Sequence, residues 1–142
     1  MVTRHTAQIG SLVVLLANSG VVLGLQQDAV SQLYGCTTVE TITVTEVGIT
    51  VCDADATAEL QERAENENLQ IRGGALVVES VPTSLAARAG LQVGDLIYRV
   101  GGINITGAEA VTEKLSLLDS ASDTMVNFLR HGRPYRIKLR SN

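Results

Sequence analysis

The sequence predicts an α+β domain in which a small, strongly bent antiparallel sheet, a partial barrel, is closed by two helices. Short runs of Val, Ile and Leu alternate with stretches of helix-forming residues, in the order strand, helix, strands, helix, hairpin. One Phe and no Trp among 142 residues leave a core of β-branched and aliphatic side chains, which suit strands. Thirteen glycines against two prolines indicate many tight turns.

The N-terminal segment, residues 1–36, is predicted to be separate from a domain that spans residues 37–142. Residues 9–25 are largely apolar, and the small residues at 29–31 fit a cleavage site, so the layout is that of a secretory signal. The apolar run is short for a membrane anchor, which needs about 20 residues. The alternative interpretation is two β-branched strands joined by a turn at residues 17–20.

The sequence of residues 37–68 predicts strands followed by a helix. Residues 37–51 alternate β-forming and polar residues, which predicts one or two strands. Residues 55–68 carry apolar residues at helical spacing, and Asp53 or Asp55 is expected to cap that helix.

The sequence from residue 75 onward predicts shorter elements that follow one another closely. They are a strand from residue 75, a short helix at 84–89, a strand at 96–100, an amphipathic helix at 108–118, and strands at 125–130 and 135–140 joined by a hairpin.

Charge and cysteine content exclude some classes of function. A net charge of −4 argues against a general nucleic-acid-binding protein, which needs a basic face. The acidic residues between 40 and 67 and the basic run at 130–140 are interpreted as two solvated faces. Cys36 and Cys52 are too few ligands for a zinc site, so no metal or cofactor is predicted. The sequence does not decide whether these two cysteines form a disulfide, which requires an exported chain, or are two separate buried thiols.

Three stretches resemble a PDZ domain, at residues 74–82, 84–97 and 126–133. The middle stretch also has a physical logic, because Gly90 supplies the positive φ that ends a one-turn helix. Asp95, after the turn at Gly94, accepts backbone N–H bonds before the next strand. The order of loop, strand, helix and Gly-Ala-Leu-Val strand resembles the bacterial HtrA/Deg protease type of the domain, and the resemblance covers about residues 45–141.

The resemblance implies a binding site for extended peptides. In that family, backbone N–H groups of a loop bind the C-terminal carboxylate of a partner, and the peptide adds a strand to the sheet. By position, Val47, Gly48 and Ile49 are expected at the carboxylate, and Ile49, Thr50 and Val51 at the added strand. The facing wall is expected from the helix that begins at Ala108, and its groove positions are Ala108, Thr112 and Leu115.

Two side chains shape the expected specificity of this site. A small apolar Ala108 favours a hydrophobic residue two places before the end of the peptide. Glu46 departs from the apolar residue that the family has there, and with Glu40 close in sequence it is expected to weaken carboxylate binding. Internal segments or basic peptides are then the alternative ligands, as is a PDZ fold that binds nothing.

Catalysis is not predicted. Residues 11–25 are loosely similar to the strands that follow the nucleophile of HtrA-type proteases, but Leu12 and Val13 replace two glycines of the motif and His5 lies too close to act as the base. The leading hypothesis is therefore a non-catalytic, extracytoplasmic (periplasmic) module that binds protein C-termini or unfolded segments. It would act in protein quality control, as an adaptor of a separate protease, with any membrane contact through the N-terminal segment. The alternative is the C-terminal fragment of an HtrA-like serine protease whose catalytic residues lie elsewhere.

Overall fold

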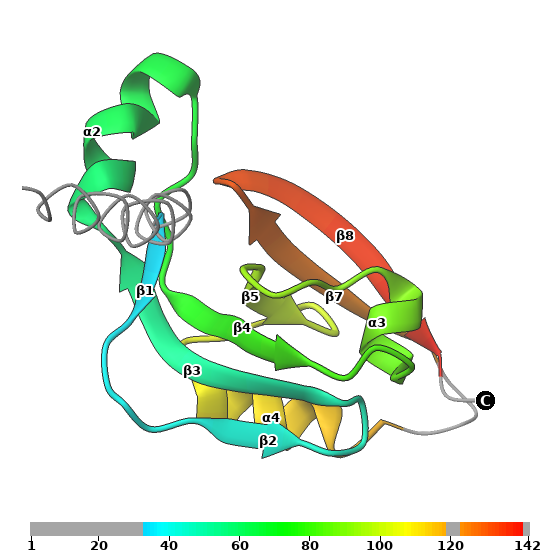
Figure 1. Cartoon of the computed structure of the whole chain (residues 1–142). Coiled ribbons are helices and arrows are strands. Elements are labelled where there is room, and N and C mark those ends of the chain that lie inside the picture. Colours follow the sequence, from blue (N-terminus) through cyan, green and yellow to red (C-terminus); the bar gives the residue numbers. More distant parts are fainter. Residues whose placement is uncertain (1–32, 119–122, 141–142) are drawn as a thin grey trace, which may run out of the picture. The chain divides into compact units, whose positions relative to one another are not determined.

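An eight-stranded antiparallel sheet organises the part of the chain that the computed structural model describes, residues 33–118 and 123–140 (Figure 1). The strands are β1 (Tyr34–Cys36), β2 (Ile42–Val44), β3 (Ile49–Ala56), β4 (Gly74–Ser80), β5 (Leu96–Val100), β6 (Ile103–Asn104), β7 (Asp123–Arg130) and β8 (Arg133–Arg140). The helices of the same ranges are α2 (Ala58–Glu67), α3 (Leu85–Ala89) and α4 (Ala108–Leu115). The predicted α+β architecture is confirmed, and the described ranges contain the short helix α3 in addition to the two longer helices.

The strand order is β1-β3-β4-β5-β7-β8, and the sheet stays open because its two end strands do not pair with each other. Two short strands lie off this path, since β2 also pairs with β3, and β6 pairs with β5. One edge of β3 is therefore paired with β4, and its other edge is shared by β1 and β2.

The hypotheses for residues 1–31, which include a signal, an anchor and a protease remnant at residues 11–25, fall outside the described residues. Within the described ranges, no helix is both long enough and apolar enough to cross a membrane. The sheet begins at Tyr34 in β1, three residues before the position 37 at which the domain was expected to start.

The expected cap of the first long helix was wrong. Thr57 caps α2, and its side-chain oxygen accepts a hydrogen bond from Leu60 N at 3.4 Å. Asp53 lies too far upstream for this role because β3 continues to Ala56. Instead, Asp53 Oδ1 accepts a bond of 2.6 Å from Ala108 N, at the first residue of α4. The carboxylate thus caps a helix that is 55 residues away in the sequence.

The closing hairpin is tighter than expected. Only His131 and Gly132 separate β7 from β8, and both have positive φ values, 52° and 80°. Two central residues with positive φ define a type I′ turn, whose twist suits a hairpin. Pro134 consequently lies within β8, a strand at the end of the sheet, where the missing N–H is tolerated.

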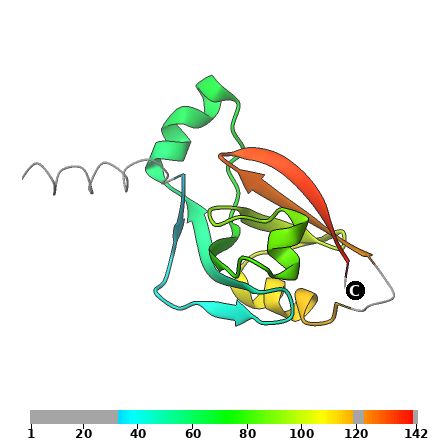
Figure 2. The same cartoon turned by 45° about the vertical axis from the view of Figure 1, so that its right-hand side comes forward.

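Buried clusters cover both faces of the sheet. One cluster joins β3, β4, β5 and β7 to α3 and α4, and Phe128 is its largest fully buried side chain. The other includes Leu60 of α2, and it packs Tyr34 and Cys52 against the opposite face. The two views agree that α2 and α4 lie towards opposite ends of β3 (Figures 1 and 2).

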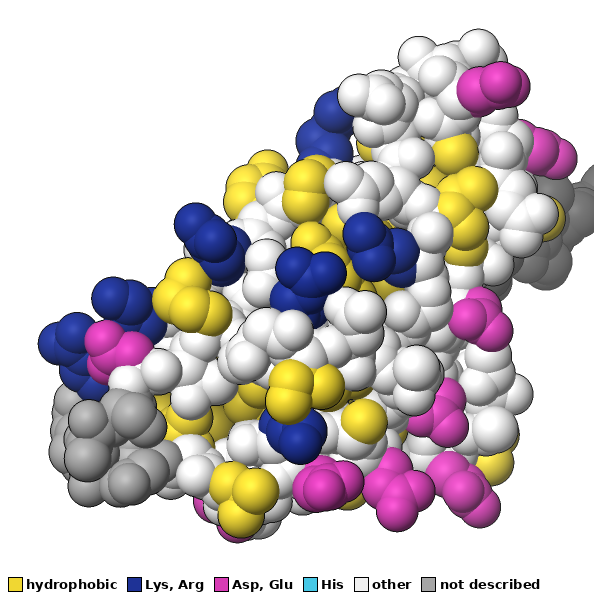
Figure 3. Space-filling model, turned by 180° about the vertical axis from the view of Figure 1, so that it is seen from behind, with side chains coloured by type: hydrophobic (Ala, Val, Ile, Leu, Met, Phe, Trp, Pro, Cys, Tyr) yellow, Lys and Arg dark blue, Asp and Glu magenta, His cyan; other side chains and the backbone are white. Residues whose placement is uncertain are grey.

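The surface charges are segregated. Figure 3 shows Lys and Arg side chains spread over one face, with most of the Asp and Glu side chains along its margin. The exposed cations of β8 are Arg133, Arg136, Lys138 and Arg140. Asp123 of β7 pairs with two of them, at 2.7 Å from Arg140 Nε and 3.4 Å from Lys138 Nζ. Charges on an edge strand also discourage pairing with another chain.

Tyr34 links the stability of the β1 region to pH. Its side chain is 6% exposed and its hydroxyl donates to Gln70 O at 2.8 Å. Burial raises the pKa of Tyr34 from 10.0 to about 12, against a smaller lowering by Arg72. The folded state therefore favours the neutral phenol, and this contribution is complete below pH 10.0 and is lost as the pH rises to about 12.

We expect the free energy of unfolding to fall by roughly 2 to 3 kcal/mol across that pH interval through this group. The check is urea unfolding at closely spaced pH values, compared with Tyr34→Phe. The variant is expected to be less stable by a constant amount below pH 10.0 because the bond to Gln70 O is lost, and to lack this part of the fall at higher pH. The same fall in both proteins would contradict the assignment.

Candidate peptide-binding site

The structure brings the predicted site residues together at the outer edge of β3 and on α4. We use the name β3–α4 site for Ile49, Thr50 and Val51 with Ala108, Thr112 and Leu115. α4 packs against β2, β3, β4 and β5. Ile49, Val51, Ala108 and Leu115 belong to one buried cluster, each at most 4% exposed. Thr112 is half-buried, and its hydroxyl donates to Ala108 O at 2.8 Å.

The outer edge of β3 is already occupied. β2 pairs antiparallel with it, in the register Ile42↔Val51, Thr43↔Thr50 and Val44↔Ile49. Val44 is fully buried in the cluster of the β3–α4 site, and Ile42 packs against that cluster. The chain's own β2 therefore fills the position at which an added strand was predicted.

The sequence reasoning missed this occupancy. It predicted one or two strands between residues 37 and 51 and left their pairing undefined. A signal was present, because Ile42 and Val44 alternate with polar residues and Gly48 follows four positions later. Two such runs around a short Gly-containing loop indicate a hairpin.

The predicted carboxylate loop is a four-residue turn, Thr45 to Gly48, between β2 and β3. Gly48 has φ +80° and donates its N–H to Val44 O at 2.9 Å, and Val47 N donates to the same oxygen at 3.3 Å. Two of the three amides predicted for a carboxylate thus point at one backbone carbonyl of the preceding strand.

The far side of this turn is fixed to the rest of the domain. Val47 O accepts from Ala86 N at 3.0 Å, and Gly48 O accepts from Val81 N at 2.9 Å. Val47 is only 1% exposed. The position of the turn therefore depends on α3 and on the segment before it, independently of β2.

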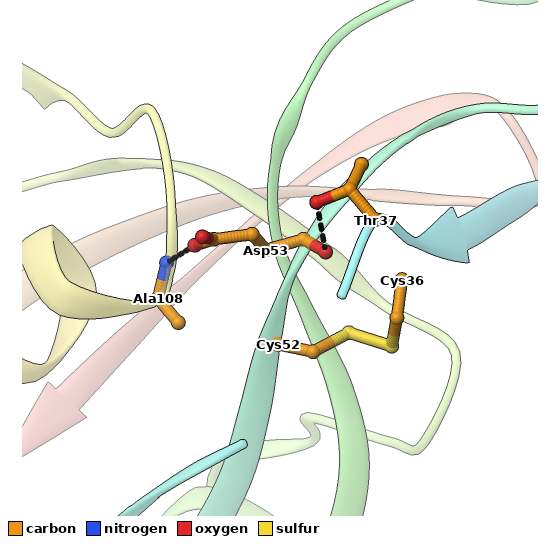
Figure 4. The surroundings of a disulfide bond; sticks show 5 residues. All are labelled: Cys36, Thr37, Cys52, Asp53 and Ala108. Atoms are coloured by element: carbon orange, nitrogen blue, oxygen red, sulfur yellow. Dashed lines mark hydrogen bonds between the residues drawn. A yellow bond between two sulfur atoms is a disulfide. The ribbon is translucent and has the colours of Figure 1, made fainter. Parts of the chain in front are cut away.

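A disulfide closes the segment that contains β2. The sequence did not decide whether Cys36 and Cys52 are bonded to each other. The structure joins them by a disulfide, with their Cα atoms 5.7 Å apart (Figure 4). Next to the disulfide, Thr37 N and Thr37 Oγ1 donate to Asp53 O at 2.8 and 3.3 Å. Cys36 at the end of β1 is exposed, whereas Cys52 in β3 is fully buried.

The acidic residues that were expected to weaken carboxylate binding lie in solvent. Glu46 is exposed in the turn, 3.4 Å from the hydroxyl of Thr45, and Glu40 is exposed before β2. Water screens exposed charges strongly, so their effect on a bound carboxylate is smaller than that of buried ones.

A second feature lies on the face of the strands that includes Thr43 and Thr50. An open cleft of about 510 Å³ has a mainly apolar lining, formed by Thr43, Gly48, Ile49, Thr50, Val78, Glu79, Ser80, Val81, Pro82 and Val93. Ser80 Oγ is buried there without a hydrogen-bond partner among the described residues. Thr43 Oγ1 and Thr50 Oγ1 lie 3.0 Å apart and are hydrogen-bonded.

Comparison with known families identifies the domain. The sequence profile of the PDZ domain family matches residues 76–127, which run from β4 into β7. The chain therefore contains a PDZ domain.

The relatives with similar sequences are periplasmic proteases. The chain is 29% identical over 73 residues to a probable periplasmic serine protease do/HhoA-like of Haemophilus influenzae, covering 51% of this chain and 16% of that protein. It is 33% identical over 70 residues to a probable periplasmic serine endoprotease DegP-like of Halomonas elongata, covering 49% and 15%. The matched segment thus spans about one sixth of the length of these relatives.

Solved structures show the same fold. The HtrA3 PDZ domain bound to a phage-derived ligand, FGRWV, has a TM-score of 0.50 at 21% identity, covering 72% of this chain and 86% of that one. The HtrA-type protease AlgW with a decapeptide has a TM-score of 0.51 at 22% identity, covering 66% and 27%. These two likenesses show that the described domain has the PDZ fold.

Proposed function

We propose that this domain binds extended peptides, protein C-termini above all, by strand addition at the β3–α4 site. The pairing of β2 with β3 carries the proposal, because it shows that an antiparallel strand fits beside Ile49, Thr50 and Val51. The two similar structures are described with a bound ligand or decapeptide, which supports the same mode of binding.

The proposed ligand ends in a hydrophobic residue and has another two places earlier. Ala108 leaves room for the second of these, and β2 itself places Ile42 two residues before Val44. The amides of Val47, Gly48 and Ile49 are the proposed donors to the terminal carboxylate.

The test is fluorescence polarisation of the whole chain, under reducing and oxidising conditions, with hydrophobic peptides made as free acid and as C-terminal amide. We expect each free acid to bind about tenfold more tightly, because a terminal amide removes a charged acceptor and places donors against donors. Equal affinity would indicate binding of internal segments instead. No binding of either form under any condition would contradict the proposed function.

We further propose that the protein is a non-catalytic, extracytoplasmic module that acts in protein quality control as an adaptor of a separate protease. The disulfide between Cys36 and Cys52 supports an oxidising compartment, and the relatives are named as periplasmic. Any attachment to a membrane would use residues 1–31.

The second candidate is the peptide-binding part of an HtrA-like serine protease, which the names of the relatives favour. Incubation of the whole chain with casein distinguishes the two candidates. The non-catalytic proposal requires that casein stays intact, and its cleavage at a rate proportional to chain concentration would favour a protease.

A further inference from the structure

β2 lies in the β3–α4 site in the manner of a bound peptide. It runs antiparallel to β3, and its three residues pair with the three residues proposed to bind a ligand strand. It packs against α4 from that position. An external peptide cannot pair with the same edge of β3 until β2 has left.

Val44 takes the place of a terminal residue. Its side chain is fully buried in the cluster that includes Ala108, Val111 and Leu115. Its carbonyl oxygen accepts the N–H bonds of Gly48 and Val47, at 2.9 and 3.3 Å. The same two amides are proposed for the carboxylate of a ligand, so Val44 satisfies both the side-chain and the backbone requirements of the site.

The N–H groups of Val47 and Gly48 would keep their positions if β2 left the site. Val47 and Gly48 are held by Ala86 and Val81 through their carbonyl oxygens, on the side away from β2. If β2 moves, these two residues stay in place, and their N–H groups become available to a new acceptor.

The disulfide restricts that movement. β2 lies between Cys36 and Cys52 in the chain, inside a ring closed by a bond with a sequence separation of 16. With the bond intact, both ends of the segment are fixed to β3, one through the turn and one through Cys36. After reduction this end loses its covalent link and is held by the pairing of β1 with β3, by the buried side chain of Tyr34 and by the bonds of Thr37 to Asp53 O. A reductant can reach the exposed Cys36, whereas Cys52 is buried.

We infer that β2 is a built-in competitor of the β3–α4 site, and that the Cys36–Cys52 disulfide holds it there until a dithiol reduces the bond. In that exchange Cys36 and Cys52 each gain one electron and one proton, and the two thiols of the reductant become a disulfide. The tethered strand has an effective concentration on the order of mM or more, so it excludes free peptides of ordinary affinity. This inference rests on the proposed function of the site.

The test uses the whole chain and a peptide with the sequence of residues 40–44, Glu-Thr-Ile-Thr-Val, as a fluorescein-labelled free acid. Binding is measured by fluorescence polarisation to the oxidised chain, to the chain reduced by dithiothreitol, and to the double variant Cys36→Ser/Cys52→Ser. We expect the reduced chain and the double variant to bind at least about tenfold more tightly than the oxidised chain. Dithiothreitol should leave the affinity of the double variant unchanged.

A relocated disulfide provides the matched control and guards against loss of folding in the reduced chain. Thr43 and Thr50 oppose each other in the β2–β3 pair, within reach of a disulfide. Thr43→Cys/Thr50→Cys in the Cys36→Ser/Cys52→Ser background is expected to bind the peptide only when reduced.

Equal affinity in the oxidised and reduced states, for both the native and the relocated disulfide, would overturn the competitor role and leave the proposed function standing. Absence of binding to every variant, with circular dichroism showing folded protein, would instead overturn the proposed function.

Discussion

Replacement of Asp95 by asparagine is expected to lower the free energy of unfolding by about 3 kcal/mol, because it breaks an ion pair whose carboxylate is buried and whose arginine side chain is 25% exposed. Asp95 is 1% exposed and binds Arg130 through both carboxylate oxygens, with Nε–Oδ1 and Nη2–Oδ2 distances of 2.8 Å. Asp95 Oδ2 also accepts from Gln92 N at 2.8 Å. An asparagine nitrogen would place a donor against the guanidinium donors.

Among the described residues, Arg130 forms no ion pair with an acidic side chain other than Asp95. It lies over the rings of Phe128 and Tyr135, at 5.1 and 5.6 Å from their centroids, and donates to Gly90 O at 2.7 Å. Its bonds to Asp95 raise the pKa of Arg130 in the native protein. The guanidinium also stays charged after the substitution, because arginine is not deprotonated in proteins. The pair connects the end of α3 to β7, which explains why an Asp at this position is part of the recognised pattern.

Urea unfolding of Asp95→Asn beside Asp123→Asn checks this prediction. Asp123 also holds Arg140 through two oxygens, but that arginine side chain is 66% exposed. We expect a loss of less than about 1 kcal/mol for the exposed pair. Equal losses for the two variants would show that burial does not determine the strength of the Asp95–Arg130 interaction.

Replacement of Gly48 by alanine is expected to cost about 2 to 5 kcal/mol and to abolish peptide binding. Its φ of +80° is strained for any residue with a Cβ, which costs about 1 to 2 kcal/mol. An added Cβ would also lie closer than 3.0 Å to Ser84 Cβ. Ser84 cannot easily yield, because its side chain caps α3 by accepting from Ala87 N at 3.2 Å. Forcing the two apart adds about 1 to 3 kcal/mol.

Gly102 is the matched control for Gly48. Its φ is +82°, and a Cβ there would have no neighbour within 4 Å. Gly102→Ala is therefore expected to show the backbone cost alone, about 1 to 2 kcal/mol, with peptide binding retained. The difference between the two variants in thermal unfolding isolates the clash with Ser84. Equal losses of stability in the two variants would show that the turn at Gly48 does not pack as closely against Ser84 as the structure indicates.

The second half of the domain could be predicted from sequence because its signals are local. Gly90 ends α3 and Asp95 accepts a hydrogen bond from Gln92 N, both within a few residues of their own position, and the structure places them so. The bond of Asp95 to the distant Arg130 was not predicted. The limits of β7 and β8 were less accurate, because two positive-φ residues, His131 among them, allow a shorter turn than the four residues expected.

The candidate site was harder to predict, because its contents depend on contacts between distant residues. Asp53 was expected to cap the next helix and instead caps α4. This contact depends on the folded sheet, which brings Asp53 close to the start of α4. The alternation around Ile42 and Val44 indicates a strand, but a period of two says nothing about which edge the strand joins. The family resemblance pointed to the edge of β3, and the structure shows that this chain supplies its own strand there.

The most direct measurement of the β3–α4 site is isotope-filtered NMR of the reduced, labelled chain with the unlabelled peptide of residues 40–44. In the free chain, Thr43 and Thr50 lie opposite each other and should give a nuclear Overhauser contact between their side chains. At saturation with peptide, we expect this contact to disappear and Thr50 to show contacts with the peptide instead. Persistence of the Thr43–Thr50 contact in the peptide complex would show that ligands bind elsewhere and that β2 is a permanent strand of the sheet.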